Sequence, residues 1–233
     1  METALVTGAN KGIGREIARR LVAAGMTVYL GARDAVRGRE AADAVGARFV
    51  QLDVTDEEQV ASAVAGIESL DVLVNNAAVA VEWGTPAPEV TAAQMRAAYE
   101  VNVFGVVAVT RACVPLLRRS PAGRIVNMAS QLGSLSVLGS AGRVPDRQLL
   151  AYSSSKAALN ALTLLYARAL APVRVNSVHP GLIATDLNGF APGDGVGTVE
   201  DGADLPVRVI LGESGTGQFY GEGRYARDGR VPW

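Results

Sequence analysis

The chain has 233 residues, which suits one domain of the larger kind because hydrophobic cores stop growing near ~250 residues. Hydrophobic residues make up 49% of the chain and charged residues 19%, so a folded globular protein is expected. A net charge of -1 provides no field that gathers phosphates, and we therefore expect neither nucleic acid nor a membrane as partner. The first residues lack the pattern of a signal peptide, and we expect a cytoplasmic protein.

The single cysteine and the single histidine limit the available chemistry. Cys113 alone excludes an intrachain disulfide, and His179 alone excludes a zinc site with the usual several Cys and His ligands, so no metal is predicted. A Ser-His-Asp hydrolase would depend on His179, but no G-x-S-x-G nucleophile sequence accompanies it. We predict that His179 is structural or lines a pocket and that Cys113 is a core residue.

Short apolar runs alternate with longer amphipathic stretches through the first 180 residues. The runs predict strands at residues 4–6, 27–30, 48–52, 72–74, 124–128 and 173–178. The stretches between them predict helices at residues 15–24, 35–45, 57–67, 91–117 and 151–170, followed by a short helix near 199–211 and a last strand near 218–220. This order indicates an α/β fold with a doubly wound parallel sheet in a single domain, 1–233. Glycine-rich sequence predicts a mobile substrate loop at about 182–199.

A glycine-rich segment, Thr7-Gly8-Ala9-Asn10-Lys11-Gly12-Ile13-Gly14, follows the first predicted strand, and helical sequence begins at Arg15. A strand, a glycine turn and a helix start present free N–H groups and the positive end of the helix dipole to an anion. The segment lacks the Lys-Ser or Lys-Thr pair of a nucleoside triphosphatase loop. An ordinary helix-capping turn is the alternative, but the position after the first strand favours a dinucleotide.

The second predicted strand ends in Gly31-Ala32-Arg33-Asp34, where NAD enzymes usually place a carboxylate for the adenosine ribose. The planar donors of Arg33 suit a 2′-phosphate, and Lys11 adds a second positive charge, so the sequence favours NADP(H) over NAD(H). In the alternative interpretation Asp34 accepts from the ribose and Arg33 is a solvated charge. We expect Asp34 to cap the next helix instead.

Tyr152 and Lys156 open a predicted helix, and their four-residue spacing places the phenol and the ammonium on one face. A neighbouring cation stabilises phenolate, which predicts a lowered pKa for Tyr152 and a proton donor of the kind that carbonyl reduction needs. A surface pair is the alternative. Lysine and arginine total 22 residues, yet lysine occurs only at Lys11 and Lys156, inside the two motifs, which indicates that an ammonium is required there.

Together these motifs resemble the short-chain dehydrogenase/reductase family in its single-domain form. The resemblance spans the chain and rests on Thr7 to Gly14, Asp53, Asn75-Asn76-Ala77-Ala78, Asn102, Ser130, Tyr152 with Lys156, Pro180-Gly181 and Thr185. Asn10-Lys11, Ala32-Arg33-Asp34 and Gly217-Gln218-Phe219 look most like the monomeric NADPH-dependent carbonyl reductases.

The resemblance implies roles for particular residues. Tyr152 is the general acid in reduction, Lys156 lowers its pKa and bonds the nicotinamide ribose, Ser130 polarises the carbonyl, and Asn102 holds a water that relays protons. Asp53 accepts from the adenine amino group, Asn75 lines the cofactor channel, and Ile183 with Thr185 meets the nicotinamide amide and the phosphates. The implied cofactor-binding set is Gly8, Asn10, Lys11, Gly12, Ile13, Gly14, Arg33, Asp53, Val54, Asn75, Ala77, Tyr152, Lys156, Pro180, Gly181, Ile183 and Thr185. As alternatives, Ser130 is a turn residue, Asn102 bonds nearby backbone, and Asp53 and Thr185 are caps.

The expected activity is NADPH-dependent reduction of a ketone, aldehyde or quinone-like carbonyl. Trp83, Leu135, Phe190 and Trp233 are candidates for apolar pocket walls. Two alternatives stay open: an NAD(P)-dependent alcohol dehydrogenase that works in the oxidative direction, and a non-catalytic NADP-binding regulatory protein. Residues 140–147 lengthen the separation of Ser130 from Tyr152 and resemble an insertion that blocks association in monomeric relatives, so we expect a monomer rather than a homo-oligomer.

Overall fold

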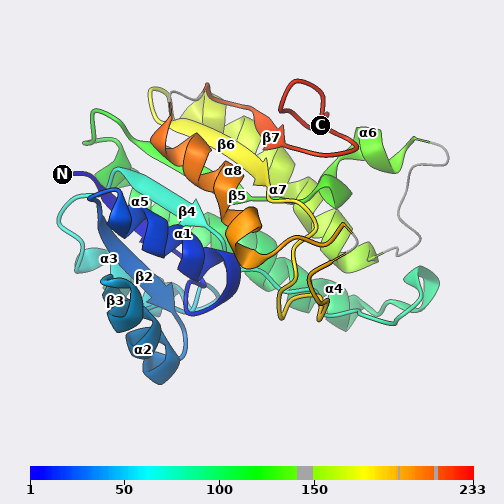
Figure 1. Ribbon diagram of the computed structural model, residues 1–233, viewed down its shortest axis with the longest axis horizontal. Helices are drawn as coiled ribbons and strands as arrows, with labels where there is room; N and C mark the ends of the chain where they lie inside the picture. Colours follow the sequence, from blue (N-terminus) through cyan, green and yellow to red (C-terminus); the bar gives the residue numbers. More distant parts are fainter. Residues whose placement is uncertain (141–148, 194, 213–214) are drawn as a thin grey trace.

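A parallel β-sheet forms the centre of the structure, a computed structural model that describes residues 1–140, 149–193, 195–212 and 215–233 (Figure 1). Its strands lie in the order β3-β2-β1-β4-β5-β6-β7, and all neighbours are parallel. Their bounds are β1 (Thr3–Val6), β2 (Thr27–Ala32), β3 (Arg48–Gln51), β4 (Val72–Asn75), β5 (Arg124–Met128), β6 (Arg174–His179) and β7 (Phe219–Gly221). The predicted doubly wound parallel sheet is confirmed. The chain order reverses between β1 and β4, where such sheets bind ligands.

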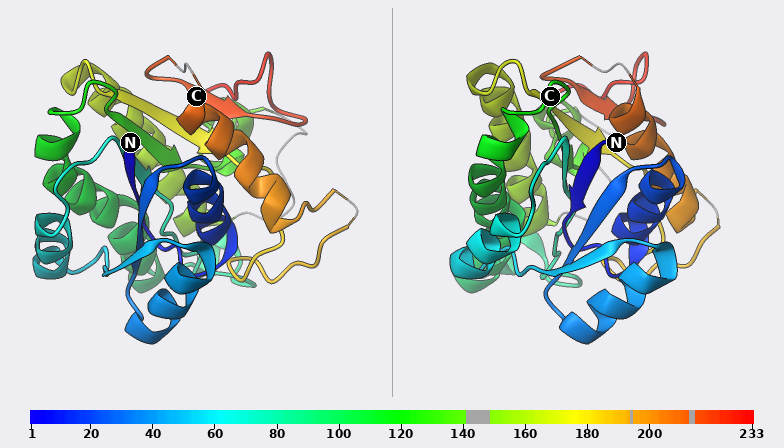
Figure 2. Two further views of the ribbon diagram at one scale, coloured as in Figure 1. Left: turned by 60° about the vertical axis from the view of Figure 1, so that its left-hand side comes forward. Right: turned by 90° about the vertical axis from the view of Figure 1, so that its left-hand side faces the viewer.

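Helices cover both faces of this sheet (Figure 2). On one face lie α1 (Gly12–Ala23), α2 (Ala35–Val45) and α8 (Val199–Leu211), which share one core cluster. On the other lie α3 (Glu57–Ala65), α5 (Gly105–Leu117) and α7 (Leu150–Ala169), which share a second. Within β1, Ala4 and Val6 belong to the first cluster and Leu5 to the second. Both faces of the strand are therefore buried, which explains its uninterrupted apolar sequence.

The predicted helix at residues 91–117 is in fact three segments. It contains α4 (Ala92–Tyr99), a π-helical turn, η2 (Glu100–Phe104), and α5 (Gly105–Leu117). Thr91 and Gln94 form a capping box at its start. The span Ala92–Leu117 is long and apolar enough to cross a membrane by length and composition, but Val109, Cys113 and Leu117 are buried in the core cluster against the sheet.

Most other predicted bounds agree with the structure to within a few residues. The largest shift is at α1, which begins at Gly12 because the glycine loop turns directly into the helix. Two short elements were not predicted, the 3-10 turn η3 (Gln131–Gly133) and the helix α6 (Leu135–Leu138), since so few residues carry no periodic signal. A further 3-10 turn, η1 (Ala87–Glu89), precedes α4. The predicted insertion at 140–147 lies outside the described residues except for Ser140.

Candidate active site

The glycine loop and the carboxyl ends of the strands enclose a groove of about 690 Å³. Gly8 and Gly12 have φ of 62° and 58°, a region that residues with a Cβ rarely adopt. A Cβ on Gly8 would lie 2.8 Å from Cα of Ala77, and one on Gly14 would lie 2.3 Å from Nδ2 of Asn76. These glycines are therefore needed for the loop to lie against the segment that follows β4.

The start of α1 suits a phosphate group. Its N-cap residue, Lys11, makes no side-chain bond to the N–H groups of the first turn, so they face the groove together with the positive end of the helix dipole. The structure places these predicted cofactor-binding residues on the groove: Gly8, Asn10, Lys11, Gly12, Ile13, Gly14, Arg33, Asp53, Val54, Ala77 and Thr185. Residues from distant parts of the sequence thus converge at one edge of the sheet.

Asn75 does not line this groove, and that expectation is wrong. It is the last residue of β4 and is 3% exposed, and its Nδ2 donates to Oδ1 of Asn127 at 2.8 Å and to Oγ1 of Thr110 at 3.3 Å. Because side chains alternate between the two faces of a strand up to its last residue, the side chain of Asn75 points into the core. Asn76 lines the groove instead and donates to the carbonyls of Thr7 and Gly8. The Asn-Asn doublet is the sequence signal for this position, and its second member is the one that lines the groove.

Two basic residues border the groove, and they differ in whether an acidic side chain pairs with them. Nζ of Lys11 lies 2.6 Å from Oδ2 of Asp186, and this hydrogen bond holds the pKa of Asp186 below its usual range. Arg33 is exposed at the end of β2, and within the described parts of the chain no ion pair engages it. Asp34 caps α2 by accepting from the N–H groups of Val36 and Arg37, both at 3.0 Å, as predicted. Arg33 is thus available to an anion near the end of β2.

Asp53 and Thr185 take part in local hydrogen bonds, but neither is the N-cap of a helix, and α3 is capped by Asp56. Oδ1 of Asp53 accepts from the N–H and the hydroxyl of Thr55, at 3.0 and 2.8 Å, and the N–H of Thr185 donates to Oδ1 of Asn188 at 3.3 Å. Both residues nevertheless line the groove. Asp53 and Thr185 can therefore keep these local hydrogen bonds and also face a ligand in the groove.

A second cavity, of about 790 Å³, adjoins the groove and shares Ile13 and Thr185 with it. Trp83 and Phe190 line it as predicted, as a T-shaped pair with centroids 5.9 Å apart, and Nε1 of Trp83 donates to the carbonyl of Leu187. Other lining residues are Ser130, Tyr152, His179, Pro180, Gly181, Leu182 and Ile183. The cavity is largely apolar, which suits an apolar ligand.

The other two predicted wall residues are elsewhere. Leu135 is 70% exposed on α6 and does not line the cavity. Trp233 packs on Phe219, with ring centroids 5.3 Å apart, because Oγ of Ser134 and Oγ of Ser136 hold the carbonyls of the last two residues. Both assignments are wrong for the same reason: contacts between distant segments direct these side chains.

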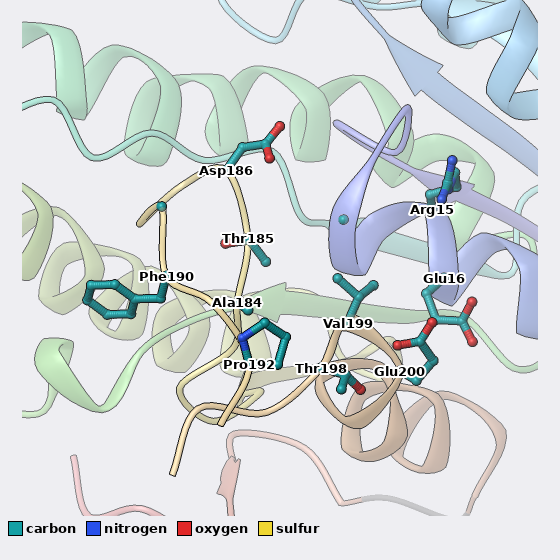
Figure 3. Close-up of a pocket in the computed structure, with 12 residues that line it drawn as sticks. Arg15, Glu16, Ala184, Thr185, Asp186, Phe190, Pro192, Thr198, Val199 and Glu200 are labelled. Atoms are coloured by element: carbon teal, nitrogen blue, oxygen red, sulfur yellow. The ribbon is translucent and has the colours of Figure 1, made fainter. Parts of the chain in front are cut away.

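A third hollow, of about 610 Å³, continues the same edge of the sheet. Figure 3 shows the segment from Ala184 to Pro192 facing the first turns of α1 and α8, with Arg15 and Glu200 at the border. It shares Gly12 and Thr185 with the groove. We therefore treat it as an extension of the groove under this segment.

Three of the predicted catalytic residues meet at the cavity wall. Ser130 follows β5 and forms a side-chain hydrogen bond with Tyr152 on α7. Lys156 lies one turn further along α7 and is 2% exposed, with Nζ 5.6 Å from the centroid of the Tyr152 ring. Nζ of Lys156 donates to the carbonyl of Met128 at 2.8 Å. The cluster therefore joins the end of β5 to the first turns of α7.

The predicted lowering of the Tyr152 pKa is not found in this structure. Burial raises the pKa of Tyr152 to about 12, the hydrogen bond with Ser130 opposes this rise, and the charge of Glu82 adds to it. Burial also lowers the pKa of Lys156 to about 8. Desolvation therefore outweighs the neighbouring ammonium, and the phenol holds its proton at neutral pH.

Asn102 makes different contacts from those predicted. Its side chain is fully buried in the π-helical turn, Nδ2 donates to the carbonyl of Val79 and to Oγ of Ser155, and Oδ1 accepts from the N–H of Val79. Both amide hydrogens are therefore used by the protein, and the relay water at Asn102 stays a prediction. Asn102 instead joins the segment after β4 to α7, which fits the frequent occurrence of π turns at functional sites.

His179 is buried at the end of β6 and lines the cavity, as predicted. Burial lowers its pKa to about 4, and its Nδ1 has no hydrogen-bond partner in the described residues. Cys113 lies in the core as predicted, and burial raises the pKa of its thiol to about 12. Among the residues that the structure describes, no three His, Cys, Asp or Glu side chains are grouped to hold a metal ion.

A doubly wound sheet with a glycine loop at its first crossover and a Ser, Tyr and Lys cluster at the same edge defines a class, the dinucleotide-dependent oxidoreductases. The family model for short chain dehydrogenase matches residues 2–193. The chain therefore belongs to the short-chain dehydrogenase/reductase family of oxidoreductases.

Individual relatives are similar over nearly the whole chain. Salutaridine reductase from Papaver bracteatum is 32% identical and covers 94% of each sequence. The (+)-neomenthol dehydrogenase of Arabidopsis thaliana is 32% identical over 89% of this chain and 90% of its own. The structure of NADPH bound carbonyl reductase from chicken fatty liver has a TM-score of 0.87 at 26% identity and covers 100% of this chain and 99% of its own.

Proposed function

We propose that the protein is an NADPH-dependent reductase that converts a ketone, aldehyde or quinone-like carbonyl into the alcohol. The carrying observation is that Ser130 and Tyr152 lie on the wall of an apolar cavity that adjoins the dinucleotide groove, with Lys156 beside the Tyr152 ring. Reductases among the relatives, including a carbonyl reductase with bound NADPH, support the same assignment.

The residues present fit the cofactor. The glycines let the loop lie against the segment after β4, and the uncapped first turn of α1 suits the pyrophosphate. Arg33 would hold the 2′-phosphate that distinguishes NADPH from NADH, and Lys11 would add positive charge, in competition with Asp186. The cavity-lining members of the predicted set would border the nicotinamide end; they are Tyr152, Pro180, Gly181 and Ile183. Lys156 lies behind Tyr152 on the same helix.

When bound, NADPH supplies a hydride to the carbonyl carbon. The hydroxyl of Ser130 donates to the carbonyl oxygen and stabilises the negative charge that develops there. The phenol of Tyr152 then gives its proton to that oxygen; an alkoxide is more basic than a phenolate, so a donor with a pKa of about 12 still transfers its proton downhill. Lys156 keeps a positive charge beside the resulting phenolate. Asn102 is a positioning residue for this part of α7.

The direct test is the decay of NADPH absorbance with a panel of ketones, aldehydes and quinones, run beside NADH. We expect turnover of apolar carbonyls with a preference for NADPH. Preference for NADH, or turnover of small charged keto acids at equal rates, would contradict the proposal, since no cationic clamp is found among the described cavity residues.

Replacing Arg33 by alanine should weaken NADPH binding about 10- to 100-fold, the loss of ~1.5–3 kcal/mol expected for a hydrogen bond to a charged group. NADH binding should change little, because NADH has no 2′-phosphate. Fluorescence titration of each cofactor measures both constants. Arg48→Ala is the matched control, since Arg48 is exposed at the start of β3, away from the groove. An unchanged ratio of the two affinities would remove Arg33 from the assignment.

Gly133→Ala should disrupt the cluster without touching a reacting group. A Cβ on Gly133 would lie 2.5 Å from the backbone carbon of Lys156, so η3 and α7 must separate. Overpacking of this kind costs ~1–3 kcal/mol, and a displacement near 1 Å lowers a rate by up to about 100-fold. Thermal melting and kcat for carbonyl reduction measure the two effects. Gly66→Ala, which creates only ordinary contact at 3.7 Å, is the control and should change neither.

The oxidative direction uses the same residues, and a dehydrogenase is among the relatives. The raised pKa of Tyr152 favours reduction, because oxidation needs the phenolate as base. A non-catalytic NADP-binding regulator is disfavoured because the tyrosine and the lysine are both in place. We retain reduction as the proposed direction.

Three further expectations remain part of the proposal. The segment at about 182–199 would be a mobile cover of the substrate, held at its base by the bridge between Ile183 and Gly197. The protein would be a monomer, which gel filtration tests. Its location would be cytoplasmic.

A further inference from the structure

Glu82 is a buried carboxylate beside the active site that the sequence analysis did not select. It lies between β4 and η1 and is 0% exposed. Its Oε1 accepts from the N–H of Tyr152 at 2.7 Å, and its Oε2 accepts from the N–H of Val81 at 3.1 Å. No Lys, Arg or His among the described residues forms an ion pair with it. A buried carboxylate without a cationic partner is costly, so its position requires an explanation.

The helix that carries the reacting residues explains how Glu82 is accommodated. The N-cap residue of α7, Leu149, makes no side-chain cap bond. Glu82 comes from a different segment and accepts from Tyr152, the third residue of the helix, so it performs the capping from outside. The positive end of the helix dipole also favours a carboxylate at this point. The same bond fixes the turn of α7 on which the phenol lies.

Glu82 also acts on the phenol through its charge. Burial, followed by the charge of Glu82, raises the pKa of Tyr152, while Ser130 opposes the rise. The cation on the same helix is Lys156, which donates to the carbonyl of Met128. Titratable or charged groups on the elements that pack against α7 are Arg96 and Tyr99 on α4, Glu100 on η2, and Arg174 and His179 on β6. Among these neighbours, His179 shares the cavity with the phenol, and burial lowers its pKa to about 4, so it is neutral at pH 7.

We propose that Glu82 is a positioning residue that fixes the first turn of α7 and, through its negative charge, keeps Tyr152 in its proton-carrying form, which favours carbonyl reduction over alcohol oxidation near neutral pH. This inference rests on the proposed function of Tyr152 as proton donor. It adds a residue that is not among those lining the groove or the cavity.

The test is Glu82→Gln, which keeps the shape of the side chain and an oxygen that accepts from the N–H of Tyr152 but removes the charge. The rate of alcohol oxidation with NADP⁺ is measured against pH. We expect its midpoint to move to lower pH by about one unit, equivalent to a roughly tenfold faster oxidation at a pH below both midpoints. The pH at which carbonyl reduction loses half its rate should also move to a lower value. Glu89→Gln, the same change at an exposed position of the same connecting segment, should leave both profiles unchanged.

Two results distinguish this inference from the proposed function. If activity depends on Tyr152 but Glu82→Gln has the pH profile of the unsubstituted protein, the inference about Glu82 fails alone. If activity survives Tyr152→Phe, the proposed function fails first. Should Glu82→Gln not fold, Glu82→Asp replaces it. We expect the midpoint of the pH profile to stay in place because the charge is kept. We expect the rate to fall because the shorter side chain lengthens the hydrogen bond from the N–H of Tyr152. A midpoint one unit lower in that variant would overturn the inference.

Discussion

Replacing Tyr152 by phenylalanine is expected to lower kcat for carbonyl reduction by about 10²- to 10⁴-fold, the usual contribution of a positioned general acid. The change removes one hydroxyl from the cavity wall and leaves the ring beside Lys156. In the proposed mechanism the phenol carries the transferred proton, so Ser130 alone would then stabilise the developing charge. The rate is measured as NADPH consumption with the best substrate of the carbonyl panel.

The control for this variant is on the same helix. Tyr166→Phe also removes a phenol hydroxyl, but Tyr166 packs against the core cluster beneath the sheet and should leave kcat unchanged. NADPH affinity should be nearly the same in both variants and in the unsubstituted protein, since Tyr152 acts on the carbonyl. Full activity of Tyr152→Phe would show that another group provides the proton.

The second large effect is on stability. Replacing Arg124 by alanine should lower the free energy of unfolding by ~2–4 kcal/mol, because it leaves the buried carbonyl of Ile210 without its donor and removes the ion pair with Glu2, whose side chain is 40% exposed. The guanidinium is 4% exposed; it donates to both carboxylate oxygens of Glu2 at 2.8 and 2.7 Å and to the carbonyls of Ile210 at 2.7 Å and Ala122 at 3.0 Å. It therefore links the N-terminus, β5 and the end of α8.

Thermal melting measures this loss, which corresponds to a fall in Tm of about 4–16 °C for a chain of this size. Arg119→Ala, at an exposed position after α5, is the control and should change Tm little.

The hydrogen bond from Arg124 also lowers the pKa of Glu2. The stability from this pair is thus present above the ordinary pKa of a glutamate and is lost as the pH falls through the lowered value. The difference in Tm between variant and unsubstituted protein should shrink in acid; a difference independent of pH would assign the loss to packing alone.

Part of the active site could be predicted because its information is local. Tyr152 and Lys156 are four residues apart on one helix, so the helical period alone places them on one face. The glycine loop follows a strand and precedes a helix, and its φ values at Gly8 and Gly12 are those that only glycine adopts easily. Parallel strands bring their carboxyl ends to one edge, which also placed Ser130 near the pair.

The remaining errors concern residues whose surroundings come from distant segments. Asn75 and Asn76 are adjacent in sequence, yet Asn75 is buried in the core and Asn76 lines the groove. The reason is that β4 ends at Asn75, so only Asn75 keeps the side-chain direction that the strand imposes. Trp233 was predicted to line the cavity but packs on Phe219. Glu82 was missed because it meets Tyr152 across 70 residues of sequence, and no spacing rule connects them.

The sequence by itself determined the family, the order of strands and helices, and the identity of the glycine loop and the Tyr-Lys pair, because apolar periodicity and short-range spacing are properties of the chain alone. Only the tertiary structure decided the protonation of the site. The pKa of Tyr152 depends on desolvation and on the charge of Glu82, and the side chain of Asn102 is engaged by Val79 and Ser155. Burial and charge act through space, so their balance is set when the segments pack together.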